Sequence, residues 1–432
     1  MLFEQLTQIT QLPAKISHAP KHRARELASG LLLLGLVLSA PMLRAETTLE
    51  LDGFASVGGG KLDDDSINQQ NRLTHNEFSE DTEFDRDSRV AIQLSAWFDN
   101  DVSLSAQAIS DGAEDYDPAL EWAYVGYDVN QNIKFRLGRM RRPLYSYSDY
   151  LQVGYAYPWI RPPVEVYSRD LQFFDGIDAI DVLYQAPLSD WNFSTQAYYG
   201  QSSGDAEVAK NTEVEFRSRD DFGLVFNFDR DWLNLRLGYH KSPSADIGQP
   251  GQLSQLVGGV STAGFESTAE ALRTRDIDVD FYTLGVNVDT NDWIGSFEYI
   301  NVQIDTGLGN EERSWYLMAG RRIGPYTLHL TYADRDRDNQ RPLSAPIYAA
   351  INQLAPGAGD PRVDAAIASL SALASGVDQA VAATNIQQHS YTLGLRYNFQ
   401  SPASIKVEYQ RIFDDRQKLT NNLVSFVIDF LF

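Results

Sequence analysis

The chain of 432 residues has no cysteine and only six histidines, and both absences exclude kinds of chemistry. Without cysteine there is no disulfide framework, no thiolate zinc site and no thiol nucleophile. Two histidines precede residue 23, and the other four stand in no catalytic motif: His75, His240, His329 and His389. A serine hydrolase site needs a histidine held by an acid, so we do not expect an enzyme. We also expect no cofactor and no metal site.

Positive charge and long apolar segments are also scarce. The 36 Lys and Arg residues face 59 Asp and Glu residues, which gives a net charge of −23. This balance argues against a nucleic-acid partner, since phosphate binding needs clustered positive charge. Beyond one segment near the N-terminus, no stretch approaches the ~18–20 apolar residues of a membrane-spanning helix. A polytopic helical membrane protein is therefore excluded.

The N-terminal segment has the pattern of a secretory signal peptide. A basic cluster precedes the apolar run from Leu27 to Leu43, and Ala45 follows as a small residue at the expected cut: Lys21, Arg23 and Arg25 form that cluster. We expect residues 1–45 to be removed and residues 46–432 to form the mature protein. The alternative is a membrane anchor, which glycines and a proline within the run disfavour.

Along the mature chain the main signal is a period of two. Leu235, Leu237 and Tyr239 fall on one face of a strand, with Arg236 and Gly238 on the other. Such alternation is typical of strands with one apolar and one polar face. About sixteen segments share it, each long enough to cross a bilayer as a tilted strand: 49–58, 87–98, 101–110, 119–128, 131–140, 176–185, 190–200, 219–229, 231–241, 277–289, 291–302, 312–322, 325–334, 388–399, 403–413 and 421–432.

The connections between these segments alternate between short turns and long loops. The short turns lie at Asn100, Asn130-Gln131, Pro187-Leu188, Arg230, Thr290, Gly324 and Pro402. The long loops cover about 59–86, 111–118, 141–175, 201–218, 242–276, 303–311, 335–387 and 414–420. This sorting predicts an all-β fold, a closed antiparallel transmembrane barrel with its turns on the periplasmic side. The alternative is a soluble β-sandwich. A sandwich would not need short and long connections to alternate, and the polar face of these strands is too polar to form a second core.

The last segment ends on an aromatic residue. Apolar residues alternate up to the final position at Val424, Phe426, Ile428, Phe430 and Phe432. This strand resembles the assembly signal of Gram-negative outer-membrane proteins. The resemblance implies that the barrel-assembly machinery is a partner and that the protein lies in the outer membrane.

The mature chain as a whole resembles the general bacterial porins. The resemblance is carried by the strand Leu49-Glu-Leu-Asp-Gly-Phe54, by the strand count, and by a long third loop, Met140 to Asp175, after Phe135-Arg-Leu-Gly-Arg139. It implies that this loop folds into the pore, that three barrels form a homotrimer, and that outer-membrane lipid and lipopolysaccharide surround it. The loop differs from the family pattern because it lacks an acidic Pro-Glu-Phe-Gly-Gly type segment.

Phase along each strand predicts which polar side chains face water. A lysine or arginine on the lipid face near the midplane would cost about 2–4 kcal/mol, so charged residues of the strands are expected inside. Beyond the site residues named below, the inward set comprises Gln93, Ser105, Gln107, Asn192, Gln196, Asn234, Glu298, His329, Lys406 and Glu408.

The third loop concentrates positive charge in an otherwise acidic chain. We expect the pore lining and constriction to consist of Arg89, Glu121, Lys134, Arg136, Arg139, Arg141, Arg142, Arg161, Glu165, Arg169, Asp170, Asp175, Arg236 and Arg396. Because basic rings favour anions, we hypothesise a constriction less cation-selective than the net charge indicates. The alternative is that these arginines bind lipopolysaccharide phosphates or cap loops.

These patterns predict an outer-membrane porin for passive diffusion of small hydrophilic solutes and ions. One alternative is a substrate-specific channel for anions or sugars, in which tyrosines of the third loop form an aromatic slide; they are Tyr145, Tyr147, Tyr150, Tyr155 and Tyr157. The long fifth and seventh loops also permit an adhesin or receptor barrel, whereas the lack of a catalytic histidine motif disfavours a lipase or protease barrel. An Ala-rich stretch at 361–384 predicts a surface helix in the seventh loop.

The selectivity hypothesis predicts a measurable reversal potential. In planar bilayers with a salt gradient, the wild type is expected to show weak selectivity, and Arg136→Ala and Arg141→Ala are expected to shift it toward cations. A strong cation preference that neither substitution changes would contradict the hypothesis.

Overall fold

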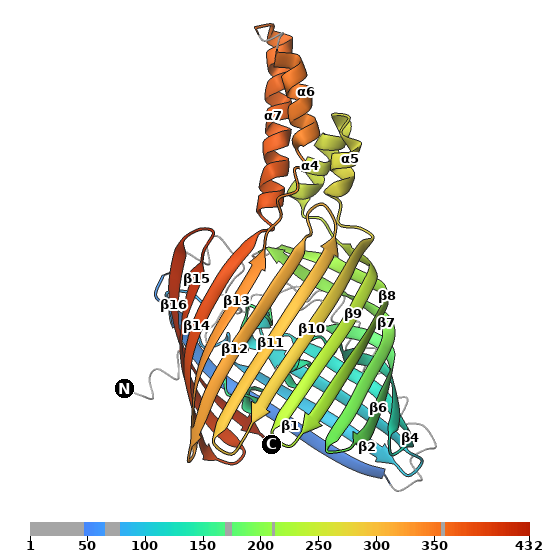
Figure 1. The fold of residues 1–432 in the computed structure, drawn as a ribbon, viewed down its shortest axis with the longest axis vertical. Helices are drawn as coiled ribbons and strands as arrows, with labels where there is room; N and C mark the ends of the chain where they lie inside the picture. The colour runs from blue at the N-terminus through green and yellow to red at the C-terminus, as the bar shows by residue number, and fades with distance from the viewer. Residues whose placement is uncertain (1–46, 65–77, 169–174, 210–211, 356–358) are drawn as a thin grey trace, which may run out of the picture.

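Sixteen antiparallel strands follow one another around a closed barrel, in which β1 pairs with both β2 and β16 (Figure 1). The computed structural model describes residues 47–64, 78–168, 175–209, 212–355 and 359–432. The strands are β1 Thr47–Leu62, β2 Arg89–Phe98, β3 Val102–Asp111, β4 Pro118–Asn130, β5 Ile133–Arg141, β6 Gly176–Leu188, β7 Trp191–Ala209, β8 Thr212–Arg230, β9 Leu233–Ile247, β10 Ile277–Asp289, β11 Trp293–Asp305, β12 Glu311–Ile323, β13 Tyr326–Arg337, β14 Ile386–Gln400, β15 Ala403–Asp414 and β16 Leu419–Leu431. The predicted signal peptide lies outside the described residues.

The alternation of apolar and polar residues sets the two faces of the barrel wall. In β13, Leu328 and Leu330 are 49% and 56% exposed on the outer face, whereas His329 and Thr331 are buried inside. Each of the sixteen predicted segments overlaps a strand, and the short turns gather at one end of the barrel. The turn predicted at Pro187-Leu188 is wrong by two residues, because both belong to β6 and the turn is at Ser189 and Asp190. The prediction of a closed antiparallel barrel is confirmed.

Backbone hydrogen bonds close the barrel where the first and last strands meet. Phe54 is opposite Leu431 in the register of β1 and β16. The Gly53 amide donates to the Phe432 carbonyl at 2.7 Å, and the Phe432 amide donates to the Gly53 carbonyl at 2.9 Å. Because a sheet edge in lipid would leave such groups without partners, closure is required for a strand-built membrane protein.

One predicted long loop, 201–218, is wrong. β7 continues to Ala209 and β8 begins at Thr212, so most of this segment is paired hairpin, with Ser202 opposite Ser218 and Gly204 opposite Phe216. The segment has only two short alternations, Ala206 with Val208 and Val214 with Phe216, separated by polar residues, which is why the sequence reads as a loop. Outside the bilayer a strand needs no apolar face, because backbone pairing alone can continue the ladder.

Helices rise from the long-loop end of the barrel (Figure 1). The helix predicted at 361–384 is confirmed as α7, Pro361–Ala382, which begins after Asp360, whose side chain accepts the Arg362 amide at 2.8 Å. Three further α-helices of the described residues were not predicted: α4 Gly251–Thr262, α5 Glu266–Ala271 and α6 Ala345–Leu354. Val260, Ile347 and Val377 join them in one apolar cluster. α7 is long and apolar enough to cross a membrane by length and composition, yet it packs here against α4 and α6.

Gly394 shows how closely the inner wall is packed. It lies opposite His329, and a Cβ on Gly394 would be 2.0 Å from His329 Nε2. His329 is 1% exposed and borders the Trp159 ring. Gly394→Ala is therefore expected to destabilise the barrel by about 1–3 kcal/mol, measured as denaturant-induced unfolding of the refolded protein in detergent.

Gly204→Ala is the matched control, because no atom lies within 4 Å of a Cβ at Gly204. It should leave the unfolding midpoint close to that of the wild type. Equal midpoints for Gly394→Ala and Gly204→Ala would contradict the packing described here.

Candidate functional site

The third loop, described at residues 142–168 and 175, turns into the barrel directly after β5. Gly138 has a φ of +140°, which residues with a side chain rarely adopt, and the Ala123 carbonyl oxygen lies 2.3 Å from the position a Cβ would take. After this irregularity Met140 and Arg141 are buried. The Arg142 amide donates to the Asp175 carbonyl at 2.6 Å and so closes the base of the loop.

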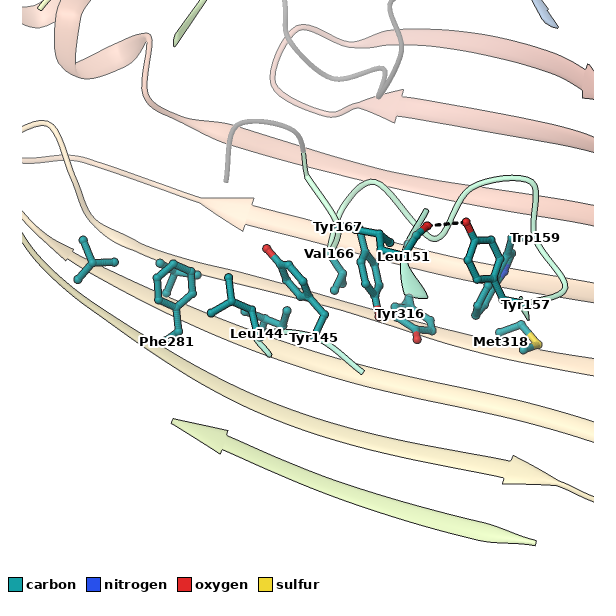
Figure 2. Packing of buried hydrophobic residues seen from close by; sticks show 14 of the residues in the cluster. Leu144, Tyr145, Leu151, Tyr157, Trp159, Val166, Tyr167, Phe281, Tyr316 and Met318 are labelled. Atoms are coloured by element: carbon teal, nitrogen blue, oxygen red, sulfur yellow. Dashed lines mark hydrogen bonds between the residues drawn. The ribbon is translucent and has the colours of Figure 1, made fainter. Parts of the chain in front are cut away.

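An aromatic cluster fixes the loop against one side of the barrel wall (Figure 2). Tyr157 donates to the Leu151 carbonyl at 2.8 Å, as the dashed line in Figure 2 shows. The Trp159 indole donates to Thr331 of β13 at 2.8 Å, and its ring meets Tyr316 of β12 edge-on, with centroids 5.6 Å apart. These contacts make the loop part of the interior packing.

The burial of this cluster bears on the sugar-channel alternative. Tyr145 and Tyr157 are 2% and 3% exposed, so they cannot form an exposed row of rings for a passing sugar. Tyr150 is 39% exposed. Tyr147 and Tyr155 are partly exposed, so three of the five tyrosines retain some access to water and an unbroken row of five rings is not formed.

Carboxylates of the wall accept hydrogen bonds from the loop. Glu298 of β11 is fully buried and accepts the Ser146 amide at 2.7 Å and the Tyr167 hydroxyl. Glu408 of β15 accepts the Ile160 amide at 2.8 Å. Hydrogen bonds to a charged acceptor are among the stronger ones, and their loss would leave buried donors unpaired.

A buried lysine holds the other side of the loop. Lys406 of β15 is 1% exposed, and its ammonium donates to the carbonyls of Trp159, at 2.7 Å, and Gly154. It also pairs with Asp429 of β16 at 3.0 Å. The sequence indicated that Glu298, Lys406 and Glu408 face inward, but not that they hold the loop.

Most of the predicted lining cations have a carboxylate partner. Six of the named residues form such pairs: Arg89 with Asp111, Arg136 with Asp181, Arg141 with Glu121, Arg142 with Asp221, Arg161 with Asp87 and Lys134 with Asp128. The Arg142 and Asp221 side chains are both 0% exposed. The structure thus spreads these cations around the wall as neutral pairs and does not gather them into one ring.

Five other residues were predicted to line the pore, and three of them are in the described part of the chain. Glu165 is buried and accepts the Gln388 amide at 3.1 Å, and burial raises the pKa of its carboxyl. Asp175 is half-buried with an enclosed, unpaired Oδ1. Burial raises the pKa of Asp175 to about 7, although Arg141 and Arg142 act in the opposite direction. Arg139 is half-buried at the end of β5, where the register places it on the same outer face as Leu137, so the prediction that it lines the pore is wrong. Arg169 and Asp170 are not among the described residues.

Arg236 and Arg396 differ from the other predicted cations because both line an open cavity. This cavity of about 520 Å³ lies between the third loop and the turn end of strands β8 to β14. Residues that the sequence did not single out complete it, among them Asn227, Asn287, Arg322, Asp229 and Asp289. Register could have revealed two of them, because Asn227 is opposite Arg236 and Asn287 is opposite the predicted Asn234.

A closed sixteen-stranded barrel with an apolar outer face, a polar interior and a loop folded inside defines the class of outer-membrane diffusion channels. The model of the Gram-negative porin family matches residues 32–417, and the chain belongs to that family. It is a porin of the outer membrane, a channel for passive diffusion. No curated protein sequence matches the chain significantly.

Solved structures share the fold at low sequence identity. The outer membrane channel DcaP of Acinetobacter baumannii is 9% identical with a TM-score of 0.55, covering 89% of this chain and 97% of that one. A loop L8 deletion mutant of OmpT, an outer membrane protein of Vibrio cholerae, is 12% identical with a TM-score of 0.52, covering 89% and 99%. An anion-selective porin from Comamonas acidovorans is 12% identical with a TM-score of 0.50, covering 90% and 100%.

The anchoring role of Glu298 predicts a channel with a loosened loop when this carboxylate is removed. Glu298→Ala leaves the Ser146 amide and the Tyr167 hydroxyl without their acceptor, which costs about 1–3 kcal/mol for each buried group. Single-channel currents of this variant are expected to fluctuate more and to reach higher conductance levels than those of the wild type.

Glu215→Ala serves as the control, since Glu215 is an exposed residue of β8 that pairs with Arg217. Its current traces should match those of the wild type. A quiet trace of unchanged conductance for Glu298→Ala would show that the carboxylate does not hold the loop.

Proposed function

We propose that this porin admits small hydrophilic solutes and ions mainly by size, without a dedicated high-affinity site at the third loop and without a catalytic step. The observation that carries the proposal is the neutralisation of the interior charges in pairs around the loop. A charge with its partner at hydrogen-bond distance presents mainly a dipole to a passing ion, so neither sign is strongly selected. Selectivity should therefore be weaker than a net charge of −23 indicates.

The surroundings of the described histidines support a channel and not an enzyme. His240 is buried with its Nδ1 at 2.9 Å from the Tyr198 hydroxyl. His389 stacks on Phe413 and pairs with Asp415 at 2.7 Å. His329 packs edge-on against Trp159, with ring centroids 6.2 Å apart. Each of the three packs against an aromatic ring, and His329 also lies 3.5 Å from Glu408.

We also propose that residues 1–45 are a cleaved signal peptide and that residues 46–432 form the mature barrel, which the barrel-assembly machinery inserts through the Phe432 strand. Lipid and lipopolysaccharide would surround it in a homotrimer. Small side chains on the outer face of β1, β3 and β4 support close approach of another barrel: Ala55, Ala106, Ala108 and Ala123.

Liposome swelling tests the size-limited channel. With purified protein, permeation rates of neutral sugars are expected to fall steadily with solute size and to rise linearly with concentration. A rate that saturates for one sugar at low millimolar concentration, while sugars of equal size do not saturate, would favour the substrate-specific channel instead.

A further inference from the structure

We propose that the cavity between the third loop and the periplasmic turns is a weak binding site for small organic carboxylates, centred on Arg236 and Arg396. The inference rests on the proposed diffusion function and adds a class of solute to it. It concerns a site on the periplasmic side of the loop, among residues other than the paired arginines described above.

Arg236 is a buried cation without an ion pair among the described residues. Its side chain is on β9, and the residue is 9% exposed. One guanidinium nitrogen donates to the Pro143 carbonyl and another to the Asn227 side chain at 3.2 Å, while Nε has no partner. Glu298 and Asp149 act on it only through space, and Glu298 is already an acceptor for the loop. The enclosed Nε is not open to a ligand, but a guanidinium that lines the cavity without a carboxylate partner favours an anion there.

Arg396, on β14, repeats this arrangement at another part of the cavity. It donates to the carbonyls of Tyr155 at 2.8 Å and Tyr157 at 3.0 Å, and to the Asn398 side chain. Within the described part of the chain it too has no carboxylate partner at ion-pair distance. Asp429 attracts it through space, but that carboxylate is paired with Lys406, and the weaker repulsion from Arg322 is offset by Asp289.

The remaining cavity wall indicates an organic acid and not a bare inorganic ion. The cavity of about 520 Å³ has room for a small organic solute. Amide side chains of Asn227, Asn234 and Asn287 and the rings of Tyr147 and Tyr150 line it. Amides and hydroxyls bind hydroxyl groups, and guanidinium groups bind carboxylates, so the lining fits a small hydroxylated carboxylate.

The cavity's own acids limit the affinity. Asp289 pairs with Arg322, at 2.9 Å for one of the two contacts, and Asp229 accepts the Asn234 amide at 2.6 Å. With Arg236, Arg322 and Arg396 against Asp229 and Asp289, three positive charges meet two negative ones, a net of +1. A single excess charge in contact with water supports weak binding, which suits a channel that must release its solute.

D-gluconate is a suitable probe, with sorbitol as its uncharged counterpart. In single-channel recordings in KCl, gluconate is expected to reduce the current in a concentration-dependent manner, whereas sorbitol at equal concentration is not. Arg236→Gln and Arg396→Gln should raise the gluconate concentration for half-maximal reduction about tenfold each, because each removes a charged hydrogen-bond donor. Arg236→Lys and Arg396→Lys, which keep the charge, should lie between the wild type and the Gln variants.

Arg217→Gln is the matched control, because Arg217 is exposed near the opposite end of the barrel and pairs with Glu215. It should respond to gluconate like the wild type. Saturation-transfer NMR of gluconate with the detergent-solubilised protein measures binding independently of conduction, and heat-modifiable gel mobility verifies that each variant is folded.

The outcomes separate the site from the channel function. A protein that conducts KCl but shows no gluconate block, or a block that the Gln variants leave unchanged, overturns the site and leaves the channel intact. A protein that does not conduct at all overturns the proposed diffusion function. In that case, gluconate binding by NMR that is lost in both Gln variants would still support the site, and absence of binding would overturn it as well.

Discussion

Hydrocarbon offers backbone amides and carbonyls no water to bond with, and the rest of this structure depends on that constraint. A strand can cross a bilayer only when both of its edges are paired, so the chain must return to its beginning, as it does where Gly53 and Phe432 exchange hydrogen bonds. Closure then divides every strand into a lipid face and a water face. The period of two in the sequence, the outward leucines of β13 and the polar interior are consequences of the same requirement.

The third loop lies inside the closed barrel, and its backbone groups need hydrogen-bond partners there. A loop folded into a polar lumen brings backbone groups away from bulk water, and these groups need partners. Glu298, Glu408 and Lys406 supply them from the wall. The aromatic cluster adds apolar burial on the same side. The loop therefore belongs to the folded core. The cavity that remains beside it lies where the loop no longer contacts the wall.

The sequence predicted the strands more completely than the site, because strand phase depends on neighbouring residues and the contacts of the site do not. Strand phase is a local property, so the inward position of Arg236, Glu298 and Lys406 could be read from a few neighbours. Their partners could not, because Ser146 is 152 residues from Glu298 and Trp159 is 247 residues from Lys406. The segment 201–218 was misread because the hydrophobic signal ends with the membrane while the backbone ladder does not.

The net charge of −23 is a property of the whole chain, and it does not give the electric field that a solute meets inside the barrel. Interior acids such as Asp181 and Asp221 are neutralised by Arg136 and Arg142 at contact distance, so their fields largely cancel a short distance away. Acids on the loops are screened over about 8–10 Å in physiological salt. A solute in the cavity therefore responds chiefly to the charges that line it, and two of these, Arg236 and Arg396, have no carboxylate partner among the described residues. An acidic barrel can in this way hold a locally positive stretch, with selectivity set by which few charges lack partners.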